Sequence, residues 1–232
     1  MFRQFDASDR IDDTARAGTA AQLARSGQLA LLAALEAIGS RRGVARDEEI
    51  YAETDPADCW FKVVSGTVRI SKLLADGRRH IAGFCFAGDC FGLDTTGERV
   101  FSAEAVGDAV VMRYPHTATE RLIDERPALA RHLCEITLRD LAQAQGRLLL
   151  LGRMTAPERV AHFLIELADR RDAVRGVDVP MSRSDIADYL GLTIETVCRV
   201  LSGFRRDGTI AIPNPHRIEF RNRAAIEAVC EG

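Results

Sequence analysis

Lysine is almost absent from this chain of 232 residues. Only Lys62 and Lys72 occur among the 31 basic residues, so arginine carries nearly all of the positive charge. Arginine suits bidentate contacts with phosphate and guanine, but a coding bias produces the same ratio. Long apolar runs are also missing: none approaches the ~20 residues of a membrane span, and residues 1–18 lack the apolar core of a signal peptide. The sequence therefore predicts a cytoplasmic protein that does not enter a membrane.

The signatures of common catalytic sites are missing too. The chain contains no His-x-His, His-Glu-x-x-His, Gly-x-Ser-x-Gly or phosphate-binding loop. It has no Cys-x-x-Cys, and in a cytoplasmic protein scattered cysteines are expected to be free thiols. The six cysteines are Cys59, Cys85, Cys90, Cys134, Cys198 and Cys230. These absences predict that the chain is not an enzyme.

The overall charge does not by itself indicate a nucleic-acid partner. The formal net charge is −3, although residues 179–223 hold seven arginines against five acidic residues, a local excess of two positive charges. Affinity for nucleic acid must then come from a patterned face rather than from bulk charge. The length of 232 residues allows two domains.

Residues 182–199 are the most informative stretch, and they predict a helix, a tight turn and a second helix. Ser182 or Ser184 can cap the first helix. Gly191 is the residue expected to adopt a left-handed conformation and end it. Thr193 can cap the second helix. The segment therefore predicts a helix-turn-helix.

The second helix is expected to present polar side chains to its surroundings. Val197 and Leu201 recur at i and i+4 and predict a buried side. The residues left on the outer side are Glu195, Thr196, Cys198 and Arg199. Arginine can contact guanine O6 and N7, and glutamate can accept from cytosine N4, so this helix is predicted to read bases in a major groove. The alternative is a helical hairpin whose surface charges are only solvated.

A β-hairpin is predicted after the helix-turn-helix. Residues 209–212 and 217–220 read as two strands around the turn 213–216, whereas residues 171–178 read as a polar loop. Helix-turn-helix followed by a hairpin is a winged helix, and Arg223 is a further arginine of the wing that can touch phosphate. The candidate contacts with the DNA backbone or flanking bases are Ser182, Arg183, Thr193, Thr196, Arg217 and Arg221.

The N-terminal half shows short strand-like runs separated by turn signals. The runs cover residues 49–52, 59–64, 67–74, 80–85 and 110–114, with Asp76-Gly77 as a hairpin turn. Short strands at this spacing predict a β-sandwich or barrel. Helices are expected before them, over residues 19–37, and after them, over 117–126.

A long helix is predicted from Pro127 to about Leu151. Some of its residues alternate by four and three, as in a coiled coil of two to three heptads. This seam consists of Cys134, Leu138, Leu141, Gln145 and Leu148. A single amphipathic helix packed on its own domain would give a similar pattern. A homodimer is the favoured interpretation, because reading paired half-sites requires two-fold symmetry.

These residues resemble the Crp/Fnr family of bacterial transcription regulators. The matching motifs are Thr54-Asp55-Pro56, Val64–Arg69, Asp76-Gly77-Arg78, Gly88–Gly92, Leu148–Gly152, Ala156–Val160, Phe163-Leu164 and Met181–Arg199 with the wing. The runs Cys59-Trp60 and Leu73–Arg79 resemble the FixK branch. The resemblance covers about residues 20–225.

The resemblance implies an α+β fold with three parts. These are an N-terminal β-roll sensor-like domain of the jelly-roll, cyclic-nucleotide-binding type, a long dimerisation helix and a C-terminal winged helix-turn-helix. The expected boundaries are a flexible extension at 1–18, the β-roll with flanking helices at 19–126, the dimerisation helix at 127–152 and the DNA-binding domain at 153–232. It also implies that the protein activates transcription through contact with RNA polymerase.

The resemblance further implies an operator. Family members with Glu-x-x-Ser-Arg in the second helix read TTGA-type inverted repeats, and Glu195, Cys198 and Arg199 are the matching residues here. Cys198 in place of serine puts the outermost thymine contact in doubt. It also motivates a redox hypothesis, because a sulfinate at this position would set negative charge against DNA. The favoured interpretation is that the cysteine simply replaces serine as a small contact residue.

The sequence also indicates whether the N-terminal domain binds a small-molecule signal. Cyclic-nucleotide binders of the family place a glutamate after Phe-Gly and an arginine before Ser or Thr, where this chain has Leu93 and Phe101; Asp94 and Arg99 could substitute. An iron–sulfur site needs four cysteines, and Cys85 and Cys90 read more simply as small apolar residues. We therefore expect no cofactor and action without a ligand, as in the FixK branch.

Histidines leave two further alternatives. Haem binding needs an axial ligand, and nothing distinguishes His80, His116 or His132 for that role. A β-roll also resembles the cupin enzymes, whose metal sites need two or three histidines and a carboxylate. The β-region offers only His80, so a cupin-like enzyme is the remote alternative.

Overall fold

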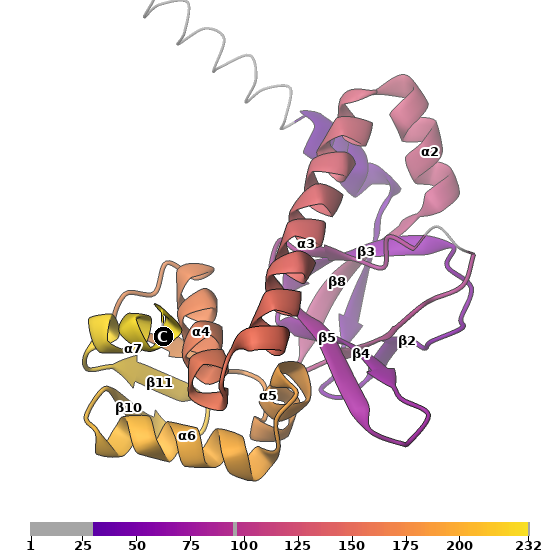
Figure 1. Cartoon of the computed structure of the whole chain (residues 1–232). Helices are drawn as coiled ribbons and strands as arrows, with labels where there is room; N and C mark the ends of the chain where they lie inside the picture. Colours follow the sequence, from indigo (N-terminus) through magenta and orange to yellow (C-terminus); the bar gives the residue numbers. More distant parts are fainter. Residues whose placement is uncertain (1–29, 95–96, 232) are drawn as a thin grey trace, which may run out of the picture.

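The computed structural model describes residues 30–94 and 97–231 of the chain. An N-terminal domain of two β-sheets is joined by one long helix to a smaller, mostly helical C-terminal domain (Figure 1). Residues 30–38 are helical. The predicted extension 1–18 and residues 19–29 of the first predicted helix lie outside the described residues.

Two four-stranded antiparallel sheets form the N-terminal roll, defined here as residues 40–115. One sheet consists of β1 (Ser40–Val44), β8 (Ala109–Pro115), β3 (Cys59–Ser65) and β6 (Cys90–Phe91), in that order. The other consists of β2 (Glu49–Tyr51), β7 (Ser102–Ala105), β4 (Thr67–Leu73) and β5 (Arg79–Phe86). The inner faces meet in a core that includes Val63, Val68, Ala103 and Val111, all fully buried.

Five of these strands were predicted, and β1, β6 and β7 were not. Strand β1 is exposed along most of its length and so has no alternating apolar pattern. Strand β7 reads Ser-Ala-Glu-Ala, residues of low or moderate strand propensity. It is a strand because Ala103 and Ala105 recur at period two and fill the core between the sheets.

The helices after the roll are α2 (His116–Glu125) and α3 (Ala128–Arg153). Trp60 anchors them: its indole stacks on Tyr114 and donates to the Thr119 hydroxyl at 3.0 Å. Leu129, at the start of α3, is fully buried in the same cluster. No helix among the described residues is long and apolar enough to cross a membrane.

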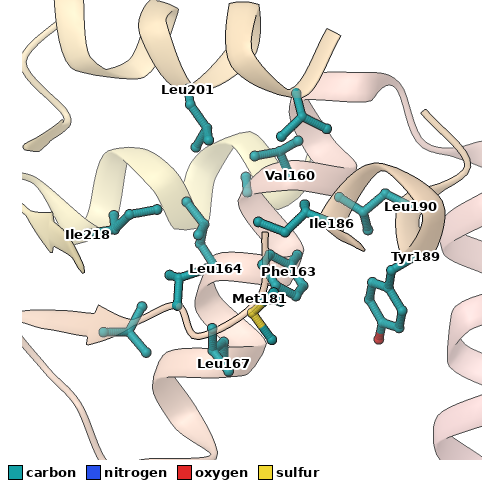
Figure 2. Packing of buried hydrophobic residues seen from close by; sticks show 14 of the residues in the cluster. Val160, Phe163, Leu164, Leu167, Met181, Ile186, Tyr189, Leu190, Leu201 and Ile218 are labelled. Carbon is teal, nitrogen blue, oxygen red and sulfur yellow. The ribbon is translucent and has the colours of Figure 1, made fainter. Parts of the chain in front are cut away.

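The C-terminal domain has four helices and a three-stranded sheet. They are α4 (Ala156–Asp169), β9 (Gly176–Asp178), α5 (Arg183–Leu190), α6 (Ile194–Arg206), β10 (Ile210–Asn214), β11 (Arg217–Phe220) and α7 (Arg223–Glu231). Figure 2 shows side chains from α4, α5, α6 and β11 converging in one core, with Leu201 directed inward from α6.

The prediction of a loop over residues 171–178 was wrong at its end. Residues 176–178 form β9, which pairs with β11 and gives the wing a third strand. Three residues with one apolar side chain, Val177, are too few to show a period. Strand β10 lies at the free edge of this sheet, which is why it tolerates Pro213.

Candidate DNA-binding surface

Helix α5 begins and ends as the sequence predicts. The Ser182 hydroxyl accepts from the backbone N–H of Asp185 at 3.0 Å, and the Asp185 carboxylate accepts from the backbone N–H of Ser182 at 3.1 Å. This reciprocal capping box satisfies two backbone donors at the helix start. Gly191 ends the helix with φ of +62°, a conformation that favours glycine. The tight turn to α6 follows.

Helix α6 buries one side and exposes the other. The Thr193 hydroxyl caps it by accepting from the backbone N–H of Thr196, while Val197 and Leu201 are buried. Glu195, Cys198 and Arg199 are exposed, and we call these three the reading face. Helical periodicity thus places all three predicted base-reading residues together, on a helix whose N-terminus is fixed by a cap.

Electrostatics within α6 favour an ionised Glu195. Its own backbone N–H and the Thr193 hydroxyl donate to the carboxylate, and the Arg199 guanidinium adds attraction, so the pKa of Glu195 lies below its ordinary value. An ionised carboxylate is acceptor-only, which suits contact with the amino group of cytosine. The Thr193 and Thr196 hydroxyls lie 3.1 Å apart and bond each other.

The exposed side of α6 continues beyond the residues named from the sequence. Ser202 and Arg206 are exposed and follow Glu195 at i+7 and i+11, so they lie on the same side of the helix. The helical period of the sequence, continued past Arg199, would have predicted that these two residues face outward. The residues named from the sequence stop at Arg199 and so do not include Ser202 and Arg206.

The wing arginines are partly engaged within the protein. Arg183 donates to the carbonyl of Pro215 at 3.1 Å, which ties the start of α5 to the wing turn. Arg217 pairs with Asp178 at 2.9 Å, and Arg221 pairs with Glu219 at 3.2 Å. Arg221 is exposed on the wing and Arg217 is half-buried there, whereas Arg183 is half-buried at the start of α5. Ser182 uses its hydroxyl in the cap.

Arg223 has a different place from the one the sequence suggested. It pairs with Asp169 of α4 and with Glu227 of α7, so it joins these two helices. Its neighbour Phe220 lies under the guanidinium, with 5.9 Å between the charge and the ring centroid. We therefore assign Arg223 to the packing of the domain.

The long helix α3 has two different sides. One side packs on its own chain through positions seven residues apart, where Leu129 and Leu150 are buried and Ile136 is half-buried. The seam lies on the other side. All five seam residues are exposed, namely Cys134, Leu138, Leu141, Gln145 and Leu148. The seam is therefore not explained by packing of α3 on its own domain.

Comparison with known proteins identifies both halves of the chain. Residues 158–229 match the model of the Crp-like helix-turn-helix domain, and residues 41–126 match that of the cyclic nucleotide-binding domain. The chain is 43% identical over 225 residues to the nitrogen fixation regulation protein FixK of Azorhizobium caulinodans, which covers 94% of this chain and 88% of that protein. The chain belongs to the Crp/Fnr family of transcription regulators.

Two further relatives place this regulator near FixK. It is 39% identical to the transcriptional activatory protein AadR of Rhodopseudomonas palustris over 169 residues, or 71% of each chain. The solved structure of FixK2 from Bradyrhizobium japonicum superimposes with a TM-score of 0.79 at 40% identity, covering 83% of this chain and 97% of that one. The predicted family, branch and fold are confirmed, and the regulator is not an enzyme.

The roll of this regulator does not fit the cyclic-nucleotide pattern. Leu93 and Phe101 are apolar where that pattern needs a glutamate and an arginine. The Arg99 side chain is 1% exposed: it pairs with Asp94 at 3.1 Å and donates to the carbonyls of Gly92 and Cys59. Asp94 and Arg99, which could have substituted for the missing groups, bond each other instead.

Aromatic rings complete the surroundings of Arg99. Its guanidinium lies 4.3 Å from the centroid of Tyr51 and 5.7 Å from that of Phe61. A Cβ atom at Gly92 would meet the Arg99 guanidinium at 2.8 Å. The Arg99 side chain is thus enclosed on several sides by groups of the roll itself.

The cysteines and histidines of the described residues do not gather into a metal site. Burial raises the pKa of the Cys90 thiol to about 11, and it also raises the pKa of the Cys85 thiol. No group of three potential ligands close enough to hold a metal occurs within residues 30–94 and 97–231. Cys198 is exposed on the reading face.

A cavity of about 250 Å³ lies between the roll and the helices α3, α4 and α5. It extends into the roll as far as Tyr51, Asp94 and Phe101. Phe84, Phe91 and Phe163 give it an apolar body, and Asp140 and Glu166 add carboxylates. Burial and the nearby Asp89 raise the pKa of Asp140.

Proposed function

We propose that this regulator binds TTGA-type inverted repeats as a homodimer and activates transcription in the cytoplasm without a small-molecule ligand. The observation that carries the proposal is the reading face. Glu195, Cys198 and Arg199 stand exposed on one side of a capped helix in a Crp-like helix-turn-helix domain. A recognition helix of this kind enters the major groove with its N-terminal residues on the base edges.

The reading-face residues have separate roles. Arg199 contacts a guanine through O6 and N7, and Glu195 accepts from the amino group of a cytosine. Cys198 contributes a small side chain near the outermost base of the half-site. Contacts with the backbone or flanking bases come from Ser182, Arg183, Thr193, Thr196, Arg217 and Arg221.

The exposed seam of α3 supports the homodimer. Leu138, Leu141 and Leu148 are large apolar side chains on the side of the helix that faces away from its own chain. Two copies packed along this seam bury these leucines as a coiled coil does. The same two-fold axis then sets the two recognition helices on paired half-sites.

Activation is proposed through contact with RNA polymerase. The relative AadR carries the name transcriptional activatory protein, and the family resemblance implies a polymerase contact. Transcription in vitro from a promoter with the operator upstream tests this step. Repression by the bound dimer would overturn it.

Ligand independence rests on the roll interior. The groups that could hold a cyclic phosphate and a ribose are either apolar, as at Leu93 and Phe101, or bonded to each other, as in the Asp94–Arg99 pair. Arg99 supplies the donors that organise this region from within the chain.

Ligand gating is the second candidate, and the 250 Å³ cavity between the roll and the helices favours it. Its lining combines the carboxylates of Asp140 and Glu166 with the guanidinium groups of Arg147 and Arg170, so a ligand there would meet charges of both signs. A gated protein would bind its operator weakly until the ligand is added.

The deciding experiment is selection of bound sequences from random DNA by purified, ligand-free protein. We expect enrichment of a TTGA-type inverted repeat. Enrichment of an unrelated sequence would overturn the proposed half-site, and no enrichment without a ligand would overturn ligand independence. A protein with Arg199→Ala and Glu195→Ala is the matched control, and it should lose the enriched motif while it keeps weak general affinity for DNA.

A further inference from the structure

Strand β5 is the main contact between the roll and the DNA-binding domain. Figure 1 shows β5 next to α5, the first helix of the helix-turn-helix. The contact has an apolar part, because Ile81 and Phe84 of β5 belong to the core of the DNA-binding domain. The ring of Phe84 lies 5.2 Å from that of Tyr189 on α5.

The contact also has a charged part, made of four side chains that we call the ion cluster: Arg69, Arg79, Asp185 and Asp188. Arg79 on β5 contacts Asp185 at 2.5 Å and Asp188 at 2.8 Å. Arg69 on β4 lies 3.6 Å from Asp185 and pairs with Glu104 of the roll at 2.7 Å. Both arginines come from the roll and both aspartates from α5, so the cluster crosses between domains.

Asp185 has two functions at once. One carboxylate oxygen accepts from the backbone and hydroxyl of Ser182, at 3.1 and 2.8 Å, and so completes the cap of α5. The other oxygen faces Arg79 and Arg69. The side chain is only 5% exposed, and a carboxylate buried to this extent requires its charged partners. The residue that starts α5 is thus bound to the roll.

The orientation of α6 follows from that of α5, because only the short turn 191–193 separates the two helices. Arg159 of α4 fixes the other end of α5 by donating to the carbonyl of Leu190 at 3.0 Å, and to that of Leu151 in α3 at 2.9 Å. Helix α5 is therefore held at its start by the roll and at its end by α4 and α3.

We propose that Arg79, acting through Asp185 and Asp188, is a positioning residue that holds the helix-turn-helix in its DNA-binding orientation in place of a bound ligand. This inference rests on the proposed function, because it explains how operator binding occurs without an effector. When the cluster is broken, the DNA-binding domain samples other orientations. Only the fraction of dimers with both recognition helices in register then binds the operator, and the apparent affinity falls by that fraction.

The test replaces Arg79 with a carboxylate. Arg79→Glu sets a negative charge against the buried Asp185 and against Asp188, and we expect operator binding at least about tenfold weaker, as for a competent fraction of about one-tenth. The matched control is Arg78→Glu. Arg78 is its neighbour in the same hairpin, but its side chain is 77% exposed and pairs with Asp76 of the turn. This control should bind as the parent does.

Exchanging the two charges of the Arg79–Asp188 pair distinguishes a positioning role of Arg79 from a general loss of folding in the variant. The double variant Arg79→Glu with Asp188→Arg restores an attractive pair across the same interface, and it should recover most of the lost affinity. Arg79→Gln removes the charge without adding a carboxylate, and it should weaken binding in the same direction by a smaller factor. Small-angle scattering of the ligand-free proteins should show a larger radius of gyration for Arg79→Glu and the parent value for the double variant.

Two results would overturn the proposal. One is operator binding by Arg79→Glu equal to that of the parent. The other is a folded, dimeric Arg79→Glu protein whose weak binding is not recovered by Asp188→Arg. Failure of the proposed function itself looks different, because the ligand-free parent would then not bind the operator.

Discussion

Changing Leu141 to glutamate is the most direct test of how the regulator assembles. Leu141 lies in the middle of the seam, and its side chain faces away from the domain on which α3 packs. The substitution therefore leaves the folded chain intact and acts on the contact between two copies. We expect Leu141→Glu to be a folded monomer that binds the full operator poorly.

The exposed area of the seam leucines sets the size of the loss in dimer stability that we expect for Leu141→Glu. Moving a fully exposed leucine into an apolar contact contributes about 1.5–3 kcal/mol. Leu138, Leu141 and Leu148 are 59%, 52% and 72% exposed, so each contributes about 1–2 kcal/mol when a second copy covers it. A symmetric dimer loses Leu141 twice, and at its exposure of 52% this amounts to about 1.6–3 kcal/mol, which raises the dimer dissociation constant about 15- to 150-fold. Desolvation of two glutamates adds to this loss.

Sedimentation velocity over a concentration series measures the dissociation constant, and binding to full and half operators measures the consequence for DNA. Arg139→Glu is the matched control, because Arg139 is exposed on the same helix but outside the seam. It should remain a dimer. A Leu141→Glu protein that stays dimeric at the parent's concentrations, or a monomer that still binds the full inverted repeat tightly, would refute the assignment of the seam.

The remaining predictions concern the DNA surface. Arg199→Ala should weaken operator binding by about 1–3 kcal/mol and relax specificity at one guanine position; competition with single-base variants measures this, and an equal loss for all sequences would contradict base reading. Arg217→Ala should weaken binding to all sequences alike and flatten its salt dependence, and an unchanged salt slope would remove Arg217 from the interface. Operator binding before and after peroxide, with Cys198→Ser beside the parent, tests the redox alternative: equal sensitivity is expected for a small contact residue, and greater sensitivity of the parent would identify Cys198 as a redox site.

The helix-turn-helix could be predicted closely from the sequence because its boundaries are local. Ser182, Gly191 and Thr193 each decide a helix end through contacts within three or four residues. The side of α6 that faces outward follows from the positions of Val197 and Leu201. Caps and periodicity are properties of short segments, so one sequence suffices to read them.

The features that could not be predicted depend on distant partners. Strand β9 exists because Val177 pairs with Ile218 of β11, and β7 exists because its alanines fill a core formed by other strands. The pair of Arg79 with Asp188 joins residues 109 positions apart. No local pattern distinguishes these residues from solvated surface charges, and only the packing of the roll on α5 brings them together.

The excess of arginine over lysine acquires a physical meaning at these distant contacts. Arg159 donates from three nitrogens to three carbonyls, those of Met154, Leu151 and Leu190, and so joins α3, α4 and α5. Arg99 similarly joins β3 and the segment after β6. A guanidinium can do this because its five N–H donors diverge in one plane, whereas an ammonium is a compact point charge. Arg159 therefore fixes α5, and with it the start of α6, relative to α3 and α4.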